Sequence, residues 1–320
     1  MPIKTICMSH SPFIGRVSAG ETVERDVRNK TAQLADEVAA FAPELVIMLA
    51  PDHFNGFFYD IMPAFCVGVR AQAIGDYGTP AGALRTDEDK AIALVEAMSD
   101  QGFDLSLSFR MQVDHAFAQP LAALTGSLDR YPVIPVFINA AAPPRPSMKR
   151  VRAFGTALGN FAVRSGQRVL LIGSGGLSHD PPVPSIRSAP PEVQETLIAG
   201  RNPSAEARRQ RELRTLQAGE DFAAKKGNLR DLNDEWDRKF LSALQSADTD
   251  AIDDYRDDAI TQEAGRAGHE VRTWVAALAA QAAAGPYKMD VIYQKSIPEW
   301  IVGMAMAKAE TKTETTKDAR

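Results

Sequence analysis

The sequence predicts an α/β protein, a three-layer α/β/α sandwich around a mostly parallel, mixed sheet, with additional helices near the C-terminal end. Short apolar, β-branched runs recur along the chain, and amphipathic helical segments separate them. This alternation is typical of parallel strands whose connecting helices cover both faces of the sheet. The 320 residues, 45% of them apolar and 24% charged, have an ordinary globular composition and suffice for one large domain.

Each predicted element has its own local signal. Strands are indicated by short apolar runs at 3–7, 45–49, 105–109, 133–138 and 169–172. Helices are indicated by apolar residues at helical spacing, such as Val27, Leu34 and Val38, before a Pro or Gly that ends the segment. The predicted helices span 24–41, 87–98, about 151–161 and 268–284.

The rest of the chain divides by composition. From about 190 to 250, charged stretches that favour helix predict helices packed on the edge of the same domain, as a lid. We expect residues 1–307 to form a single domain. Residues 308–320 are rich in Lys, Thr and Glu and contain no large apolar side chain, which predicts a disordered tail.

Charge and composition exclude several classes of partner. The net charge of −5 argues against nucleic acid as the main partner, and no apolar run is long enough to span a bilayer. Cys7 and Cys66 lie in apolar contexts and predict buried thiols in a reducing compartment. The chain enters its first strand without a signal-peptide pattern, so we expect a cytoplasmic protein.

A glycine-rich segment, 173–179, follows the strand at 169–172 and ends in His179. The glycines allow the backbone to turn tightly and to approach a neighbouring segment closely. A dinucleotide-binding loop would need a glycine at Ser178, and the Gly-Lys-Ser/Thr of a P-loop is absent. A nucleophile elbow does not fit around Ser174 either. The segment therefore predicts a ligand-binding turn, or alternatively a tight turn with a solvent-facing histidine.

Four of the five histidines follow strand-like segments or precede a helix: His10, His53, His115 and His179. If these strands are parallel, the four imidazoles meet at one edge of the sheet. Small polar or acidic residues stand next to them in the sequence, and ligand histidines need such acceptors, although a sequence neighbour need not be the acceptor. For any single histidine, a structural or surface role is the simpler interpretation.

A metal site with open positions needs a third ligand. Two imidazoles and one carboxylate form the facial triad of non-haem Fe(II) oxygenases, and Glu270, at the start of the 268–284 helix, is the best carboxylate. The alternative is a glutamate that only interacts with the helix dipole. The adjacent His269 also remains open as a ligand.

These motifs resemble the class III, LigB-type extradiol ring-cleavage dioxygenases. The resemblance covers residues 1–306 and rests on motifs spread along the chain. They are Ser-His-Ser-Pro at 9–12, Ala-Pro-Asp-His at 50–53, Gln-Val-Asp-His at 112–115, Gly-Ser-Gly-Gly-Leu-Ser-His at 173–179 and Gly-His-Glu-Val-Arg-Thr-Trp at 268–274.

The resemblance implies that His10, His53 and Glu270 bind Fe(II), and that His115 and His179 are an acid/base pair whose division of roles stays open. It also implies a catecholic substrate, O2 as co-substrate and a homo-oligomer. An acidic side chain on the catechol would need a cationic or amide partner, and Arg16, Arg70, Arg85 and Arg110 are the cationic candidates.

Three other functions remain open at this point. The chain could cleave another catechol, it could be a metal-dependent hydrolase in which Zn2+ activates water, or it could be a binding protein that has kept the fold.

Overall fold

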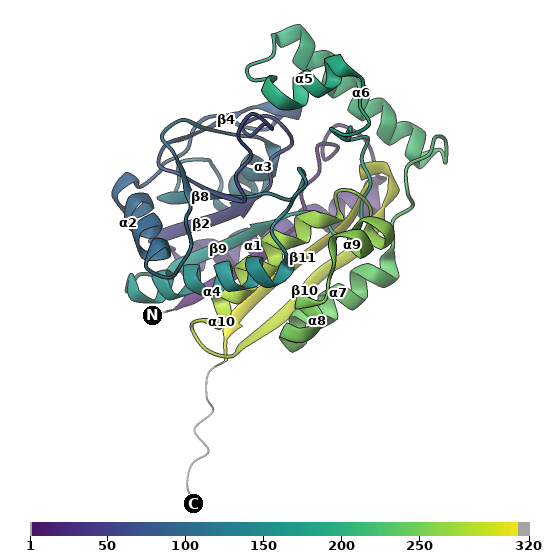
Figure 1. Ribbon diagram of the computed structural model, residues 1–320. Helices are drawn as coiled ribbons and strands as arrows, with labels where there is room; N and C mark the ends of the chain where they lie inside the picture. Colours follow the sequence, from purple (N-terminus) through teal and green to yellow (C-terminus); the bar gives the residue numbers. More distant parts are fainter. Residues whose placement is uncertain (1, 313–320) are drawn as a thin grey trace, which may run out of the picture.

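An eight-stranded sheet forms the middle layer of the computed structural model, in which residues 2–312 are described (Figure 1). The strand order is β10-β11-β1-β9-β2-β8-β3-β6. The strands span β1 Ile3–Met8, β2 Leu45–Ala50, β3 Phe65–Gly68, β6 Ser106–Ser108, β8 Val133–Ile138, β9 Val169–Ser174, β10 Tyr287–Ile297 and β11 Val302–Thr311. The α/β prediction and its mixed sheet are confirmed.

The centre of the sheet consists of four parallel strands that the sequence predicted: β1, β9, β2 and β8. Ile3 and Leu45 both pair with Val169, so the strands are in register and their carboxyl ends lie at the same edge. Every residue of β2, β8 and β9 is buried. Helices on both faces exclude water from these strands, which is why their sequences are continuously apolar.

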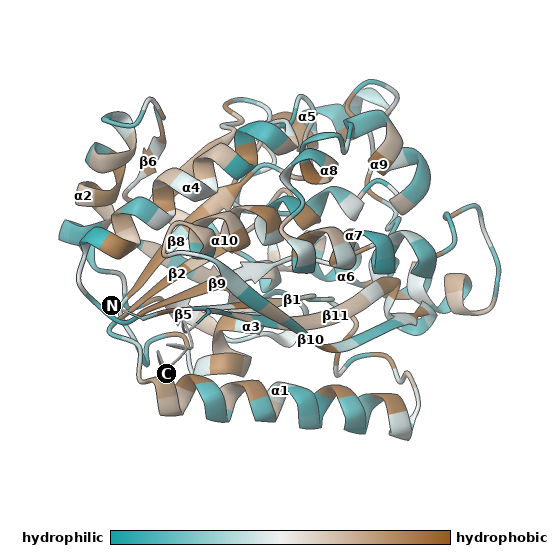
Figure 2. Ribbon diagram, turned by 90° about the horizontal axis from the view of Figure 1, so that it is seen from below, coloured by the Kyte–Doolittle hydropathy of each residue, from teal (hydrophilic) through white to brown (hydrophobic). Residues whose placement is uncertain are grey.

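Helices cover the sheet on both sides (Figure 2). On one face lie α1 and α3, which pack on side chains such as Ile6 and Met8. On the opposite face lie α2, α4 and α10, which pack on Cys7 and Leu45, together with α7 to α9. Their bounds are α1 Glu21–Phe41, α2 Glu88–Ser99, α3 His115–Thr125, α4 Met148–Arg164, α7 Asp234–Ser246, α8 Thr249–Asp253, α9 Asp257–Ala264 and α10 Arg272–Ala282.

The C-terminal strands β10 and β11 form an antiparallel pair that the sequence analysis missed, and β11 also pairs with β1. The expectation that disorder begins at residue 308 is wrong for the first four residues, which belong to β11. Ala309 is buried, and Lys308 binds Glu37 at 2.7 Å. Backbone pairing with β1 orders this segment without large side chains. The remaining residues of the expected tail, 313–320, lie outside the described residues.

A second, three-stranded sheet has the order β5-β4-β7 (β4 Ala71–Ile74, β5 Ala81–Ala83, β7 Met111–Val113). The strand predicted at 105–109 exists as β6, but β7 lies between β6 and His115. His115 therefore does not follow a strand of the main sheet, as the other three histidines do. A bend after β6 redirects the chain into the small sheet before α3 begins.

Between 190 and 250 the predicted helices are present as α5 (Pro191–Ala199), α6 (Ala205–Ala223) and α7. Figure 1 shows α5 and α6 outside the sandwich, at the top of the view. The helix predicted at 268–284 is divided into a 3-10 turn, η2 (Gly268–Val271), and α10. None of the helices in residues 2–312 has the length and apolar character needed to cross a membrane.

Candidate active site

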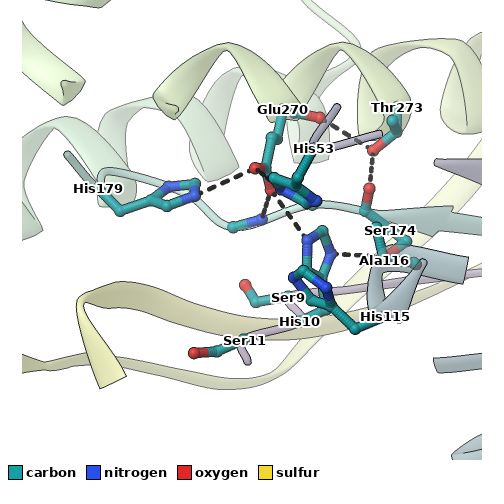
Figure 3. A network of polar contacts seen from close by, with 12 residues as sticks. Ser9, His10, Ser11, His53, His115, Ala116, Ser174, His179, Glu270 and Thr273 are labelled. Carbon is teal, nitrogen blue, oxygen red and sulfur yellow. Dashed lines mark hydrogen bonds and ion pairs between the residues drawn. The ribbon is translucent and has the colours of Figure 1, made fainter. Parts of the chain in front are cut away.

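Four histidines and one glutamate from distant parts of the chain meet beyond the ends of β1, β2 and β9 (Figure 3). The ring centroids of His10 and His53 are 5.4 Å apart, and those of His53 and His115 are 4.6 Å apart in a stacked arrangement. The carboxylate of Glu270 lies within 3.5 Å of His10 and within 3.3 Å of His179. The sequence-predicted residues are therefore neighbours in space.

His10 presents an unprotonated nitrogen to the centre of this cluster. Its Nδ1 lies 2.9 Å from Ser174 Oγ, whose own hydroxyl donates to the Ala116 carbonyl at 2.7 Å. Because the serine proton is already committed, His10 Nδ1 must be the donor, and Nε2 keeps its lone pair. Burial lowers the pKa of His10 to about 3, which also favours the neutral ring.

His53 also has a hydrogen-bond partner at Nδ1, in this case the Asp114 carboxylate, and its Nε2 faces the centre of the cluster. Its Nδ1 lies 3.0 Å from Asp114 Oδ2, and its Nε2 lies 3.1 Å from Glu270 Oε1. Burial alone would lower the pKa of His53, but the Asp114 and Glu270 carboxylates outweigh burial and raise it. A carboxylate behind Nδ1 fixes the ring orientation and increases the basicity of Nε2, as is usual for metal-binding histidines.

Glu270 reaches the site because glycines leave room for it. A side chain at Gly175 would clash with the Glu270 backbone, with a Cβ only 2.6 Å from its carbonyl oxygen. The Gly176 N–H donates to Glu270 Oε2 at 2.9 Å, and Trp274 Nε1 donates to the Gly175 carbonyl at 2.9 Å. Although burial would raise the pKa of Glu270, the histidines around it lower it well below its usual value. The close approach predicted for the 173–179 segment is confirmed.

These residues fit a metal ion. The Nε2 atoms of His10 and His53 lie 3.5 and 3.1 Å from the two oxygens of Glu270. Adjacent ligand atoms around a divalent transition metal, with bonds of about 2.1 Å, are separated by about 3.0–3.5 Å. The nitrogens of His10, His53 and His115 also lie within 4.8 Å of one another, so a three-histidine set is a second possibility. Fe, with its preference for two imidazoles and a carboxylate, suits the first set.

His115 has a carboxylate partner that the sequence analysis did not identify. Its Nδ1 lies 2.6 Å from Asp76 Oδ2, and both side chains are at most 4% exposed. Asp76 belongs to a short turn, η1 (Asp76–Gly78), and Tyr77 from the same turn packs edge-on against the His115 ring. The only sequence signal was the pair of flanking glycines, Gly75 and Gly78, which mark a tight turn.

His179 faces the cluster from the opposite side. Its Nδ1 lies 2.9 Å from the Leu177 carbonyl, and since a carbonyl can only accept, Nδ1 donates. Its Nε2 lies 3.3 Å from Glu270 Oε1. Burial would lower the pKa of His179, but the Glu270 carboxylate raises it. Asp237 supports the segment by accepting hydrogen bonds from the Ser178 backbone and hydroxyl at 2.7 and 3.0 Å.

Asp52 and Asp114 each precede a histidine of the site, but their side chains do not form hydrogen bonds with the ring of that histidine. Asp114 precedes His115 but bonds to His53, while its other oxygen caps α3 through the Ala116 N–H at 3.0 Å. Asp52 precedes His53 but accepts three backbone N–H groups of the following loop. Burial, reinforced by Asp114, raises the pKa of Asp52 to about 7. Neighbouring residues on an extended backbone point in opposite directions, which separates each pair.

His269 is turned away from the cluster. Its two ring nitrogens contact Arg272 Nη1 and Thr261 Oγ1, each at 2.7 Å. Arg272 donates to Nδ1, so this histidine is held between α9 and α10. The alternative in which His269 replaces Glu270 as a ligand has no support in this arrangement.

The four arginines suggested for an acidic substrate are all exposed. Arg70 pairs with Glu88, Arg85 donates to the Arg130 carbonyl, and Arg16 lies near Gly78. A different arginine, Arg211 on α6, contacts the His53 segment directly, since it donates to the backbone carbonyls of His53 and Phe54.

Comparison with known proteins identifies the class. The family model described as the catalytic LigB subunit of aromatic ring-opening dioxygenase matches residues 4–305. The chain therefore belongs to the LigB family of aromatic ring-opening dioxygenases, and the resemblance inferred from the motifs is confirmed.

Curated relatives narrow the comparison further. Three proteins named 2,3-dihydroxyphenylpropionate/2,3-dihydroxicinnamic acid 1,2-dioxygenase are similar over nearly their whole length. The protein from Cupriavidus pinatubonensis is 52% identical over 97% of this chain and 99% of its own. The one from Paraburkholderia xenovorans is 51% identical over 98% and 100%, and the one from Rhodococcus jostii is 46% identical over 97% and 98%. The chain is thus similar to ring-cleaving dioxygenases that act on dihydroxylated aromatic acids.

A solved structure shares the fold at much lower sequence similarity. The crystal structure of the uncharacterised Escherichia coli K12 protein JW3007 has a TM-score of 0.53 and 12% identity, over 97% of this chain and 99% of that one. This likeness supports the fold alone.

Proposed function

We propose that this enzyme is an Fe(II)-dependent extradiol dioxygenase that cleaves 2,3-dihydroxyphenylpropionate, and also 2,3-dihydroxycinnamate, with O2. Both oxygen atoms would enter the ring-opened product, a 2-hydroxy-6-oxo-dienedioate. The observation that carries the proposal is the pair of Nε2 atoms from His10 and His53 aimed at the Glu270 carboxylate, with a second histidine pair beside them. The names of the relatives support the choice of substrate.

His10, His53 and Glu270 would hold the Fe(II). When bound, the ion holds the catechol oxygens and O2 together and lets electrons pass from the ring to oxygen. The contribution of the chain is to leave Nε2 of His10 unprotonated, to orient the His53 ring and to keep the Glu270 carboxylate ionised. Ser174 and Asp114 fix the two rings, and the Gly176 N–H fixes the carboxylate.

His115 is suited to be the base that takes a catechol proton. With Nδ1–H donated to Asp76 at 2.6 Å, Nε2 is the acceptor. The buried carboxylate also stabilises the imidazolium that forms when the proton arrives. The same arrangement of carboxylate, imidazole and substrate proton operates in the Ser-His-Asp triad.

His179 is suited to be the acid. Its Nδ1 donates to a backbone carbonyl, so a second proton on Nε2 would face Glu270 Oε1 at 3.3 Å and remain available to a substrate oxygen. A histidine can give or take a proton near neutral pH at little cost, which makes the pair suitable for one transfer in each direction.

The test is anaerobic reconstitution of the purified chain with Fe(II), Zn2+ or buffer, followed by 2,3-dihydroxyphenylpropionate and O2. We expect a yellow ring-cleavage product and consumption of O2 with Fe(II) only. Metal analysis of His10→Ala, His53→Ala and Glu270→Ala should show loss of bound metal. Enzyme that consumes no O2 with this catechol, but hydrolyses a simple ester such as 4-nitrophenyl acetate when loaded with Zn2+, would instead favour a hydrolase built on the three-histidine set.

We also propose that the enzyme works in the cytoplasm as a homo-oligomer. Cys7 and Cys66 are free thiols and both are buried, which suits a reducing compartment. Size-exclusion chromatography with light scattering tests the oligomeric state.

A further inference from the structure

One helix outside the sandwich makes direct contact with the loops of the site. On α6, Arg208 donates to the Ile74 carbonyl at 3.2 Å, next to the turn that carries Asp76. Glu212 accepts the Tyr77 backbone N–H at 3.0 Å, and Thr215 contacts the Tyr77 hydroxyl at 3.2 Å. Since Tyr77 packs on His115, α6 lies directly outside this candidate base.

Arg211 projects from the same face of α6 onto the His53 segment. Its Nη2 donates to the His53 carbonyl, and its Nη1 contacts the Phe54 carbonyl at 3.2 Å and Asn55 Oδ1 at 3.4 Å. Asn55 in turn donates to Asp114 Oδ2 at 3.0 Å, the oxygen that orients His53. Arg211 is thus linked to His53, a candidate metal ligand, both directly through its carbonyl and indirectly through Asn55 and Asp114.

The charge of Arg211 is unusual for its surroundings. Other partly buried arginines face a carboxylate, as Arg152 faces Asp253 at 2.6 Å and Arg266 faces Asp180 at 2.7 Å. Within residues 2–312, neither Arg208 nor Arg211 forms an ion pair, although both are half-buried. A half-buried guanidinium whose partners are neutral carbonyls has lost hydration without gaining a counter-charge.

Part of the Arg211 guanidinium also remains available. In the described residues, its Nε–H has no acceptor, and Nη2 uses one of its two hydrogens on His53. The Nε and Nη2 hydrogens form the side of the guanidinium that binds a carboxylate through two parallel hydrogen bonds.

The site itself needs such a cation. Three buried carboxylates, Asp76, Asp114 and Glu270, surround the histidines, and an anionic substrate would meet them as like charges. In a dihydroxyphenylpropionate, bonds of about 1.5 Å place the side-chain carboxylate about 5 Å from the nearest ring oxygen. A cation that binds it must therefore lie just outside the histidine cluster, where α6 lies.

We infer that Arg211, assisted by Arg208, binds the carboxylate of the substrate side chain and so selects catechols that carry an acidic substituent. This inference rests on the proposed function, because it presupposes a catechol at the histidine cluster. In this inference α6 determines substrate specificity. Arg208 and Arg211 are three residues apart on this helix and therefore lie on the same face.

The test compares 2,3-dihydroxyphenylpropionate with 3-ethylcatechol, which keeps the ring and the first two side-chain carbons but lacks the carboxylate. For Arg211→Gln we expect the ratio of the two kcat/KM values to fall about 10- to 100-fold, mainly through KM for the acid, as the loss of a charged hydrogen-bonded pair predicts. Arg211→Lys should restore part of the preference. Arg214→Gln, exposed on the same helix, is the matched control and should keep the wild-type ratio.

Each other outcome is informative. A parallel loss on both substrates, with an unchanged ratio, would show that Arg211 only holds the His53 loop, and would overturn the inference. If 3-ethylcatechol turns over too slowly, its inhibition constant against the acid replaces kcat/KM in the comparison. Wild-type enzyme that binds Fe(II) but cleaves neither compound would refute the proposed function and, with it, this inference. If the wild-type enzyme cleaves the acid and Arg211→Gln keeps both wild-type kcat/KM values, the inference alone is refuted.

Discussion

Replacing Asp76 by Asn tests how the acid/base pair is tuned. The Asp76–His115 contact is 2.6 Å long between side chains that are 3% and 4% exposed, so water cannot take the place of the carboxylate. Asp76 Oδ1 has no hydrogen-bond partner in the described residues, so an amide NH2 placed there would also be unsatisfied. If the amide instead turns its NH2 toward His115, the ring must carry its proton on Nε2 and cannot act as a base.

The magnitude follows from the hydrogen bond that is lost. A hydrogen bond to a charged group contributes about 1.5–3 kcal/mol, which corresponds to about 10- to 150-fold in kcat/KM. We expect Asp76→Asn to lose activity in this range while keeping wild-type metal content, since Asp76 contacts no residue of the His10, His53 and Glu270 set.

The assay is steady-state cleavage of 2,3-dihydroxyphenylpropionate by enzyme reconstituted with Fe(II), with metal content measured on the same samples. The control is Asp253→Asn, which changes a carboxylate on α8 that pairs with Arg152 of α4 and contacts no residue of the site. The double variant Asp76→Asn/His115→Gln should be no worse than His115→Gln, because the two residues act as one unit. Near-normal activity of Asp76→Asn, or loss of its metal, would refute this role.

Further predictions concern the other groups of the site and the fold. His115→Gln and His179→Gln should each lower kcat about 10²- to 10⁴-fold, with a metal content near that of the wild type. If a variant loses bound metal together with activity, the replaced histidine is a metal ligand. Glu270→Gln should lose most bound metal yet keep its circular dichroism spectrum, and full occupancy would contradict its assignment. Truncation after Ala307 removes paired residues of β11 and should lower Tm by several degrees, which an unchanged melting curve would disprove. Burial raises the pKa of Asp237 to about 6, above about 3.9 in an unfolded chain. The folded state therefore binds this proton more tightly, and the free energy of unfolding should fall as pH rises from about 4 to about 6, with a weaker slope in Asp237→Asn measured by urea unfolding.

The sequence by itself determined the central strands of the sheet and the four histidines and the glutamate of the site. The central strands β1, β2, β8 and β9 are continuously apolar because both faces are covered, so their positions could be predicted from local pattern. Histidines placed directly after parallel strands must meet at one edge of the sheet, which is why His10, His53 and His179 could be grouped before any coordinates. The glycines of 173–179 correctly indicated a close approach of another segment.

Only the tertiary structure decided which side chains form hydrogen bonds with one another. Asp114 orients His53, 61 residues away, and Asp76 orients His115, 39 residues away, while the acidic sequence neighbours of these histidines do not. Arg211 reaches the His53 carbonyl across 158 residues. The 308–311 segment is ordered by backbone pairing with β1 and β10, without any large apolar side chain of its own. Local pattern fixes where a backbone turns or extends, but a hydrogen bond between distant side chains depends on how the packed layers bring them together, and no periodicity in the chain encodes that distance.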